Sequence, residues 1–275
     1  FALLSGIMLS ARGNAQRLPL LEVKDDSMEV AYFYPDAPEQ MYREIDTSLY
    51  EFQQFDLTRQ QGNLFWGHLG MLGTAARPLY YRPRYRRGLQ PGMPHYQIYR
   101  LLPDSVRFYR LDKAYTKTWF SQGGTQGDTY FKGTFSRNFG DNLNLMVDYR
   151  RLNQVGSGSA YKFQDLFAQH TALVTGLWYR STNRRYNAWL TYQFDINKMQ
   201  HNGGIQTDTL FFQEGFEGAF VVPINLDQAS GRFDHQHLTF QHRLNFSRPA
   251  VDSTQTKALQ GYAHHKVQYS LFRYL

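Results

Sequence analysis

Two runs of alternating apolar and polar residues, joined by a short turn, make up residues 129–152. In the second run Leu143 and Leu145 share one parity, whereas Asn144 between them is polar. Because successive side chains of a β-strand point to opposite faces, each run would have one apolar and one polar face. The joining residues 138–142 include the Gly, Asn and Asp that tight turns favour. The segment therefore predicts an amphipathic β-hairpin whose apolar face contacts either lipid or a second sheet.

The same unit recurs between residues 113 and 275, where the pattern predicts about seven strands. Short turns at 138–142 and 181–185 alternate with longer loops, as in outer-membrane barrels, whose short turns face the periplasm. The alternation in 166–180 is ambiguous, and His242 falls on the apolar parity of its strand. We therefore expect an all-β fold, an antiparallel up-and-down transmembrane β-barrel of which these strands form an incomplete curved sheet. The predicted strands are 113–121, 129–137, 143–152, 166–180, 186–196, 237–246 and 263–275, and the predicted extracellular loops are 122–128, 153–164 and 197–231.

Composition excludes several other classes of protein. The chain has 20 Tyr, 21 Phe and no Cys. No stretch approaches the roughly 18 apolar residues of a spanning helix, and without Cys there is no disulfide framework. The net charge of +7 comes from Arg clusters at strand ends and in the linker 82–87, with no recognisable nucleic-acid-binding motif. We therefore expect no nucleic-acid partner, and a basic rim that meets water or lipopolysaccharide.

The first part of the chain differs from the repeating part. Residues 1–9 are apolar and the small residues Gly13 and Ala15 follow, which resembles the end of a secretory signal peptide; a short buried helix is the alternative. We therefore expect a partial signal peptide at 1–15, an irregular periplasmic or lumenal segment at 16–112, and the N-terminal portion of the barrel at 113–275. The segment 16–112 would either restrict the pore or form a mobile tail. Within it, Gly70 and Gly73 are expected at a close backbone contact with another surface.

Strand parity assigns the side chains to two environments. The polar parity would line a pore, where rings of charge set ion preference, and the apolar parity would face lipid. The predicted pore-lining residues are Lys132, Asn144, Asp148, Arg150, Asn187, Gln193, Asp195, Gln241 and Arg243. The predicted lipid-facing residues are Phe131, Phe135, Leu143, Leu145, Val147, Leu190, Tyr192, Phe194, Leu238 and Phe240.

Candidate catalytic and metal-binding residues are few. His235 and His237 are two residues apart, so on a strand they point the same way, and with Asp234 they are a weak candidate for a metal site because no third ligand follows from the spacing. No Gly-x-Ser-x-Gly elbow or Ser/His/Asp set is defined by spacing. We therefore predict no enzyme activity, no metal and no cofactor.

A soluble β-sandwich is the structural alternative, because its strands alternate in the same way and bury one face against a partner sheet. The signal-like start, the aromatic residues near strand ends and the lack of a partner sheet of opposite composition favour the membrane.

Several short motifs, in their residues and in their order along the chain, resemble those of the putative porin family of Bacteroidota-type outer membranes. The resemblance spans nearly everything after residue 15. The motifs are Tyr-Phe-Tyr-Pro-Asp at 32–36, Leu-Gly-Met-Leu-Gly-Thr-Ala-Ala-Arg-Pro-Leu at 69–79, Arg-Arg-Gly at 86–88, Val-Arg-Phe-Tyr at 106–109, Phe-Ser-Gln-Gly at 120–123, Asp-Thr-Tyr-Phe at 128–131, Phe-Ser-Arg-Asn-Phe at 135–139, Gly-Leu-Trp-Tyr at 176–179 and Asn-Gly-Gly-Ile at 202–205.

This resemblance implies an outer-membrane β-barrel protein considerably longer than these 275 residues, which would be its N-terminal part. A wide channel needs about 16 to 18 strands, so the present strands would form a curved, open sheet. The implied function is a porin-like channel for passive diffusion of small hydrophilic solutes or ions, and the alternative is a scaffold or interaction barrel without channel activity. The expected partners are outer-membrane lipid, lipopolysaccharide and small hydrophilic solutes, and a homo-oligomer is left open.

Overall fold

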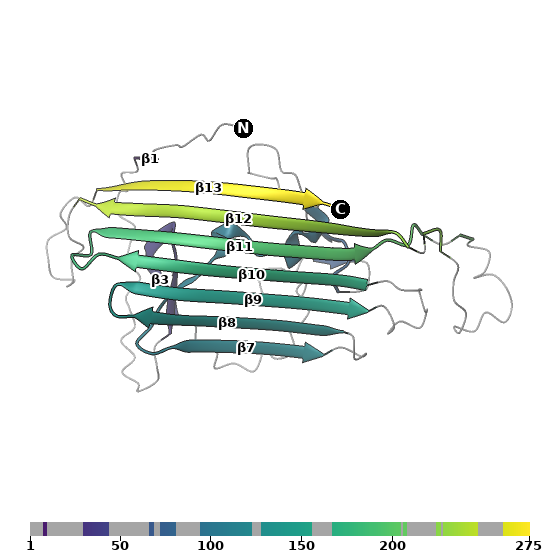
Figure 1. Ribbon diagram of the computed structural model, residues 1–275, viewed down its shortest axis with the longest axis horizontal. Helices are drawn as coiled ribbons and strands as arrows, with labels where there is room; N and C mark the ends of the chain where they lie inside the picture. Colours follow the sequence, from purple (N-terminus) through teal and green to yellow (C-terminus); the bar gives the residue numbers. More distant parts are fainter. Residues whose placement is uncertain are drawn as a thin grey trace.

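A computed structural model shows that the regular structure of the described residues is nearly all β-strand (Figure 1). The structure describes residues 8–9, 30–43, 66–68, 72–80, 94–122, 128–155, 167–204, 206–207, 224–226, 228–246 and 261–275. Nearly all of the predicted signal peptide, the basic linker 82–87 and most of the predicted loop 197–231 lie outside these ranges.

One large antiparallel sheet dominates the chain, with strand order β1-β13-β12-β11-β10-β9-β8-β7. From β7 to β13, neighbours in sequence are neighbours in space, which is the up-and-down arrangement visible in Figure 1. Strand β7 does not pair with β13 or β1, so the sheet is not closed. The predicted incomplete β-barrel sheet is confirmed. The long strands are β7 (Tyr115–Gln122), β8 (Thr129–Phe139), β9 (Leu143–Val155), β10 (Phe167–Arg180), β11 (Tyr186–Gln200), β12 (Ser230–Asn245) and β13 (Tyr262–Tyr274), and β1 (Met8–Leu9) adds two residues beside β13.

Several predicted loop boundaries were wrong. The ladder between β11 and β12 continues through Asn197↔Phe233 to Gln200↔Ser230, so the strands extend well into the predicted loop 197–231. Likewise β9 reaches Val155, beyond the predicted loop start at 153. In both cases the strands continue past the clear apolar alternation because backbone pairing does not require it.

The short turns match the prediction. Gly140 joins β8 to β9 with φ of 64°, a left-handed conformation that glycine adopts without strain. Between β10 and β11, the Ser181 hydroxyl and the Tyr186 backbone amide are 3.0 Å apart, and Asn183 Oδ1 accepts the Arg185 amide at 3.0 Å. Arg184 has φ of 58° within this turn.

The described residues of the N-terminal segment include regular structure. A three-stranded sheet has the order β3-β2-β6, formed by β3 (Ala37–Arg43), β2 (Ala31–Tyr34) and β6 (Phe108–Arg110). A hairpin pairs β4 (Trp66–His68) with β5 (Ala76–Pro78), and two 3-10 helices, η2 (Pro94–Tyr99) and η3 (Pro103–Ser105), follow. Neither 3-10 helix in the described part of the chain has the length and apolarity of a membrane-spanning helix.

The hydrophobic core lies between this N-terminal segment and one face of the large sheet. Phe33 and Phe108, which are 1% and 0% exposed, pack with Trp178 and Trp189 of the sheet. The Phe33 and Trp178 ring centroids are 4.8 Å apart. This packing explains the ambiguous alternation of 166–180, because β10 has apolar residues on both faces and its buried residues contact the N-terminal segment.

Candidate functional site

The two faces of the large sheet differ in what covers them. We call the face that carries Asn144, Gln193 and Gln241 the inner face; these side chains are 1%, 0% and 4% exposed. The opposite face, which carries Leu190 and Phe240, is the outer face, and these side chains are 41% and 40% exposed. The strand register places Lys132, Asn144, Asp148, Arg150, Asn187, Gln193, Asp195, Gln241 and Arg243 on the inner face, and Phe131, Phe135, Leu143, Leu145, Val147, Leu190, Tyr192, Phe194, Leu238 and Phe240 on the outer face.

The central part of the outer face is apolar and accessible. The register aligns Leu145, Leu177, Leu190, Phe240 and Val267 in one row across β9 to β13. Such a continuous exposed apolar surface marks an interaction site in proteins generally.

An aromatic row follows the turn end of the outer face. The Tyr179 and Tyr186 ring centroids are 6.4 Å apart, Tyr186 and His242 are 5.8 Å apart, and His242 and His265 are 5.4 Å apart. His242 therefore occupies the apolar parity as a member of this row, and its ring also stacks on Phe240 at 5.6 Å. The contacts of His242 with neighbouring aromatic rings thus explain why a histidine interrupts the apolar parity of this strand.

A buried hydrogen-bond cluster occupies the centre of the inner face. The Gln193 amide donates to the Leu101 carbonyl and, at 2.9 Å, to Asp195 Oδ2. His235 Nδ1 lies 3.1 Å from Asp195 Oδ2 and 2.8 Å from Arg100 Nη2. Because buried polar groups are costly without partners, these contacts attach the N-terminal segment to β11 and β12. Sequence reasoning missed Arg100, which is 135 residues from His235.

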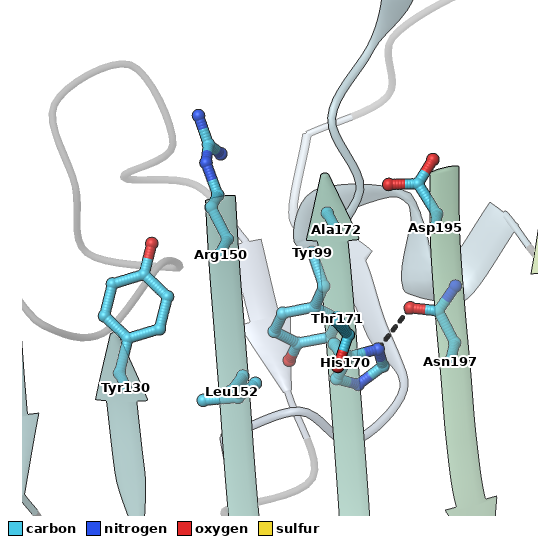
Figure 2. A pocket seen from close by; sticks show the side chains of 9 residues that line it. All are labelled: Tyr99, Tyr130, Arg150, Leu152, His170, Thr171, Ala172, Asp195 and Asn197. Atoms are coloured by element: carbon cyan, nitrogen blue, oxygen red, sulfur yellow. Dashed lines mark hydrogen bonds between the residues drawn. The ribbon is translucent and has the colours of Figure 1, made fainter. Parts of the chain in front are cut away.

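A second buried cluster surrounds His170 on β10, next to a pocket (Figure 2). The His170 ring stacks on Tyr99 with centroids 4.7 Å apart, and its Nδ1 hydrogen-bonds to Asn197, as the dashed line in Figure 2 shows. Its Nε2 lies 2.8 Å from the Gly73 carbonyl. Tyr96, at 6.0 Å from the His170 ring, is half-buried, and burial raises the pKa of its hydroxyl.

Gly73 makes the close contact that its position in the sequence predicted. It has φ of 89°, and a Cβ atom there would lie 2.9 Å from the Ala168 Cβ and 3.1 Å from Leu152. The surface it approaches is the inner face of β9 and β10.

His235 and His237 point to the same inner face, as predicted, and their ring centroids are 5.8 Å apart. His237 Nδ1 lies 2.6 Å from Ser270 Oγ, and its Nε2 lies 2.8 Å from Thr239 Oγ1. Asp234 belongs to the outer parity and does not join them. Among the described residues, no group of three or more His, Cys, Asp or Glu side chains could hold a metal ion.

Ion pairs connect the N-terminal segment to β12 and β13. Arg243 Nη1 lies 2.8 Å from Glu39 Oε2, and Lys266 Nζ lies 3.2 Å from Asp36 and 3.3 Å from Asp104. The three acidic side chains are about half exposed, so these pairs position the segment more than they stabilise it.

Further polar contacts lie near the short turns, and one of them connects the large sheet to the N-terminal segment. Asn144 Nδ2 donates to Asn138 Oδ1 at 2.6 Å, and Asn138 in turn donates to the Leu111 carbonyl. Asn187 accepts a hydrogen bond from Trp178 Nε1 at 3.3 Å.

A charged pocket lies between the N-terminal segment and strands β8 to β10. Lys132, Arg150 and Arg107 line it together with Asp148. Arg150 Nε lies 3.3 Å from Asp148 Oδ1, and the Thr134 hydroxyl donates to Asp148 Oδ2 at 3.2 Å. Three of the predicted pore-lining residues, Lys132, Asp148 and Arg150, therefore border this hollow.

Comparison with known proteins identifies the family. A family model described as "Putative porin" matches residues 33–274, which is most of the chain. No curated protein and no solved structure matches. The match covers the N-terminal segment from residue 33 and all the long strands, so both partners of the contacts described above lie within the region that the family model matches. The chain therefore belongs to the putative porin family, with the porin-like role in the outer membrane that this membership indicates.

Proposed function

We propose that the protein is an outer-membrane channel for passive diffusion of small hydrophilic solutes or ions. The observation that carries this proposal is the contrast between the faces of the large sheet: polar residues such as Gln193 and Asp195 are buried on the inner face, whereas Leu190 and Phe240 are about 40% exposed on the outer face. In water this distribution is unfavourable, because exposed apolar surface costs about 25 cal/mol per Å². In a bilayer the same outer face is stable, because lipid replaces water there.

The aromatic row supports the orientation of the sheet. Tyr179, Tyr186 and His242 cross neighbouring strands beside the short turns. Amphipathic rings collect at membrane interfaces, and short turns face the periplasm in outer-membrane barrels. We therefore assign the row to the periplasmic interface, and the opposite strand ends to the side of lipopolysaccharide.

We also propose that the N-terminal segment lies in the lumen and narrows the channel. Phe33 and Phe108 pack on the inner face with Trp178 and Trp189, and Arg100 and Gly73 contact buried residues of the same face. These contacts favour a plug over a mobile tail, because a tail would leave the polar inner face solvated.

Planar-bilayer recording on the complete protein tests both parts of the proposal. We expect discrete conductance steps from the wild-type protein and larger steps from a variant that lacks residues 16–105. A control for the deletion is the heat-dependent electrophoretic shift of a folded barrel. A folded protein with no conductance in either form would instead support a scaffold barrel, and equal conductance in both forms would contradict the plug.

A further inference from the structure

Three arginines come together where β10 turns into β11. Arg180 is the last residue of β10 and has the parity of the inner face, and Arg184 lies in the turn that follows. Arg110 is the last residue of β6 in the N-terminal segment. The end of β10 and the start of β11 lie at the left of the sheet in Figure 1. We call Arg110, Arg180 and Arg184 the arginine cluster.

Contacts on both sides of Arg110 place it at this end of the sheet. Two residues before it, the Phe108 ring lies against Gly176 of β10, where an added Cβ atom would be 2.9 Å from that ring. One residue after it, the Leu111 carbonyl accepts a hydrogen bond from Asn138 of β8, beside the β8–β9 turn. β6 therefore runs over the inner face towards the short turns, and Arg110 lies beside them.

The three positive charges of the cluster are close enough to repel one another. The charge of Arg184 acts on Arg110, and the charges of both act on Arg180. Among the described residues, none of the three forms an ion pair with a carboxylate. Like charges held near one another without counter-ions destabilise a fold, so the cluster carries an electrostatic cost that an anion would relieve.

The contacts of Arg180 leave its charge in place. Arg243, on the same inner face, is paired with Glu39 at 2.8 Å. The guanidinium of Arg180 instead lies 5.4 Å from the Trp178 ring centroid and donates to the backbone carbonyl of Asp141 at 3.3 Å. The other two arginines of the cluster are exposed, so an anion from solution can reach them.

The backbone of Arg184 favours a role for its side chain. With φ of 58°, it is the one non-glycine residue in the described part of the chain whose φ is positive. Glycine adopts this conformation more easily than any residue with a side chain. The turn itself therefore does not explain an arginine here, and such strained positions are frequent at binding sites.

We propose that the arginine cluster is a binding site for a phosphate group. A guanidinium presents its N–H donors in a planar fork that matches the oxygens of phosphate. A phosphate monoester has a charge of about −1.5 to −2 at pH 7, so it balances the three arginines more fully than a single carboxylate does. The proposal does not depend on whether the protein conducts.

Both a soluble phosphate and the headgroup of an anionic lipid have this chemistry. Arg180 has the inner parity, away from the exposed apolar residues of the outer face, and Arg110 belongs to the segment that packs on the inner face. These positions favour a soluble phosphate-bearing molecule over a lipid.

The test is isothermal titration calorimetry of the complete protein, folded in detergent micelles, with inorganic phosphate at about 0.1 M sodium chloride, where distant charges are screened. Arg184→Gly is the most informative variant, because glycine fits φ of 58° and the turn should fold at least as well without the guanidinium. We expect this variant and Arg110→Gln each to bind phosphate about tenfold more weakly than the wild type.

Arg185→Gln is the matched control. Arg185 is adjacent in sequence and exposed, but it is not among the charges that act on Arg110 or Arg180. Its loss should change phosphate affinity by less than about twofold. The heat-dependent electrophoretic shift verifies that each variant is folded.

Native mass spectrometry with added phosphatidylglycerol distinguishes the two sources of phosphate. Bound lipid that is lost in Arg184→Gly and retained in Arg185→Gln would assign the site to a headgroup, whereas the same pattern for inorganic phosphate alone would assign it to a soluble molecule. Wild-type protein that binds neither ligand would overturn the proposal, as would equal affinities of the wild type and Arg184→Gly. Neither measurement needs conductance, so failure of the channel function would be seen separately in the bilayer recordings.

Discussion

Leu190→Arg on the outer face distinguishes a lipid-facing sheet from a soluble one. Leu190 is 41% exposed and lies between Leu177 of β10 and Phe240 of β12. It is four residues from Tyr186, which we assign to the periplasmic interface. At a rise of about 3.3 Å per residue and a tilt of about 40°, Leu190 lies roughly 10 Å deeper, near the midplane of an apolar band about 25 Å tall.

The expected cost of this substitution depends on the solvent of the outer face. Arginine near the bilayer midplane costs about 2 to 4 kcal/mol, whereas near the interface it costs about 0 to 1 kcal/mol. Leu244→Arg is the matched control, because Leu244 is on the same face, is 44% exposed and lies opposite Tyr186. We therefore expect Leu190→Arg to be less stable than Leu244→Arg by about 2 kcal/mol, a factor of roughly 30 in the unfolding equilibrium.

The assay is urea unfolding of the complete protein in phospholipid vesicles, with the free energy of unfolding measured for both variants and the wild type. In a soluble sheet both sites are partly exposed surface positions, where substitutions change stability by about 0.5 kcal/mol or less. Costs for the two variants that agree within that range would refute the membrane assignment of the outer face.

Three further predictions concern the contact between the N-terminal segment and the inner face. Gly73→Ala should loosen the segment by about 1 to 3 kcal/mol, because φ of 89° disfavours a side chain and the added Cβ would lie 2.9 Å from β10; limited proteolysis should then cut the segment faster. Asp195→Ala should cost about 1 to 3 kcal/mol in urea unfolding, because it removes the buried carboxylate that accepts a hydrogen bond from the Gln193 amide. Trp178→Ala should cost about 3 to 5 kcal/mol, because it removes the ring that contacts Phe33, and it should also raise single-channel conductance if the segment narrows the pore.

Local pattern was sufficient for the hairpins. The alternation of Leu143, Asn144 and Leu145 predicted both the strand and its faces, since strand side chains alternate whatever the rest of the chain does. The turn at Gly140 followed from the left-handed conformation that a tight connection needs. His242 could not be explained in this way, because the rings that accompany it come from β11 and β13.

The contacts of the inner face depend on residues that are far apart in the chain. Arg100 meets His235 across 135 residues, and Gly73 meets His170 across 97. The spacing of these residues contains no period that links them, so sequence reasoning identified neither pair. Sequence spacing also does not predict the charged pocket, because Arg107 lies beside Lys132 and Arg150 only when the N-terminal segment packs on the sheet.

The amino-acid sequence by itself determined the strand repeat, the short turns and the division of the sheet into an apolar and a polar face. These are short-range properties, set by backbone geometry and by the order of side chains along one strand. Only the tertiary structure decided that the polar face is covered by the N-terminal segment and which of its charges border a hollow. That outcome depends on packing between elements distant in sequence, where shape and hydrogen-bond complementarity, which no local pattern records, select the partners.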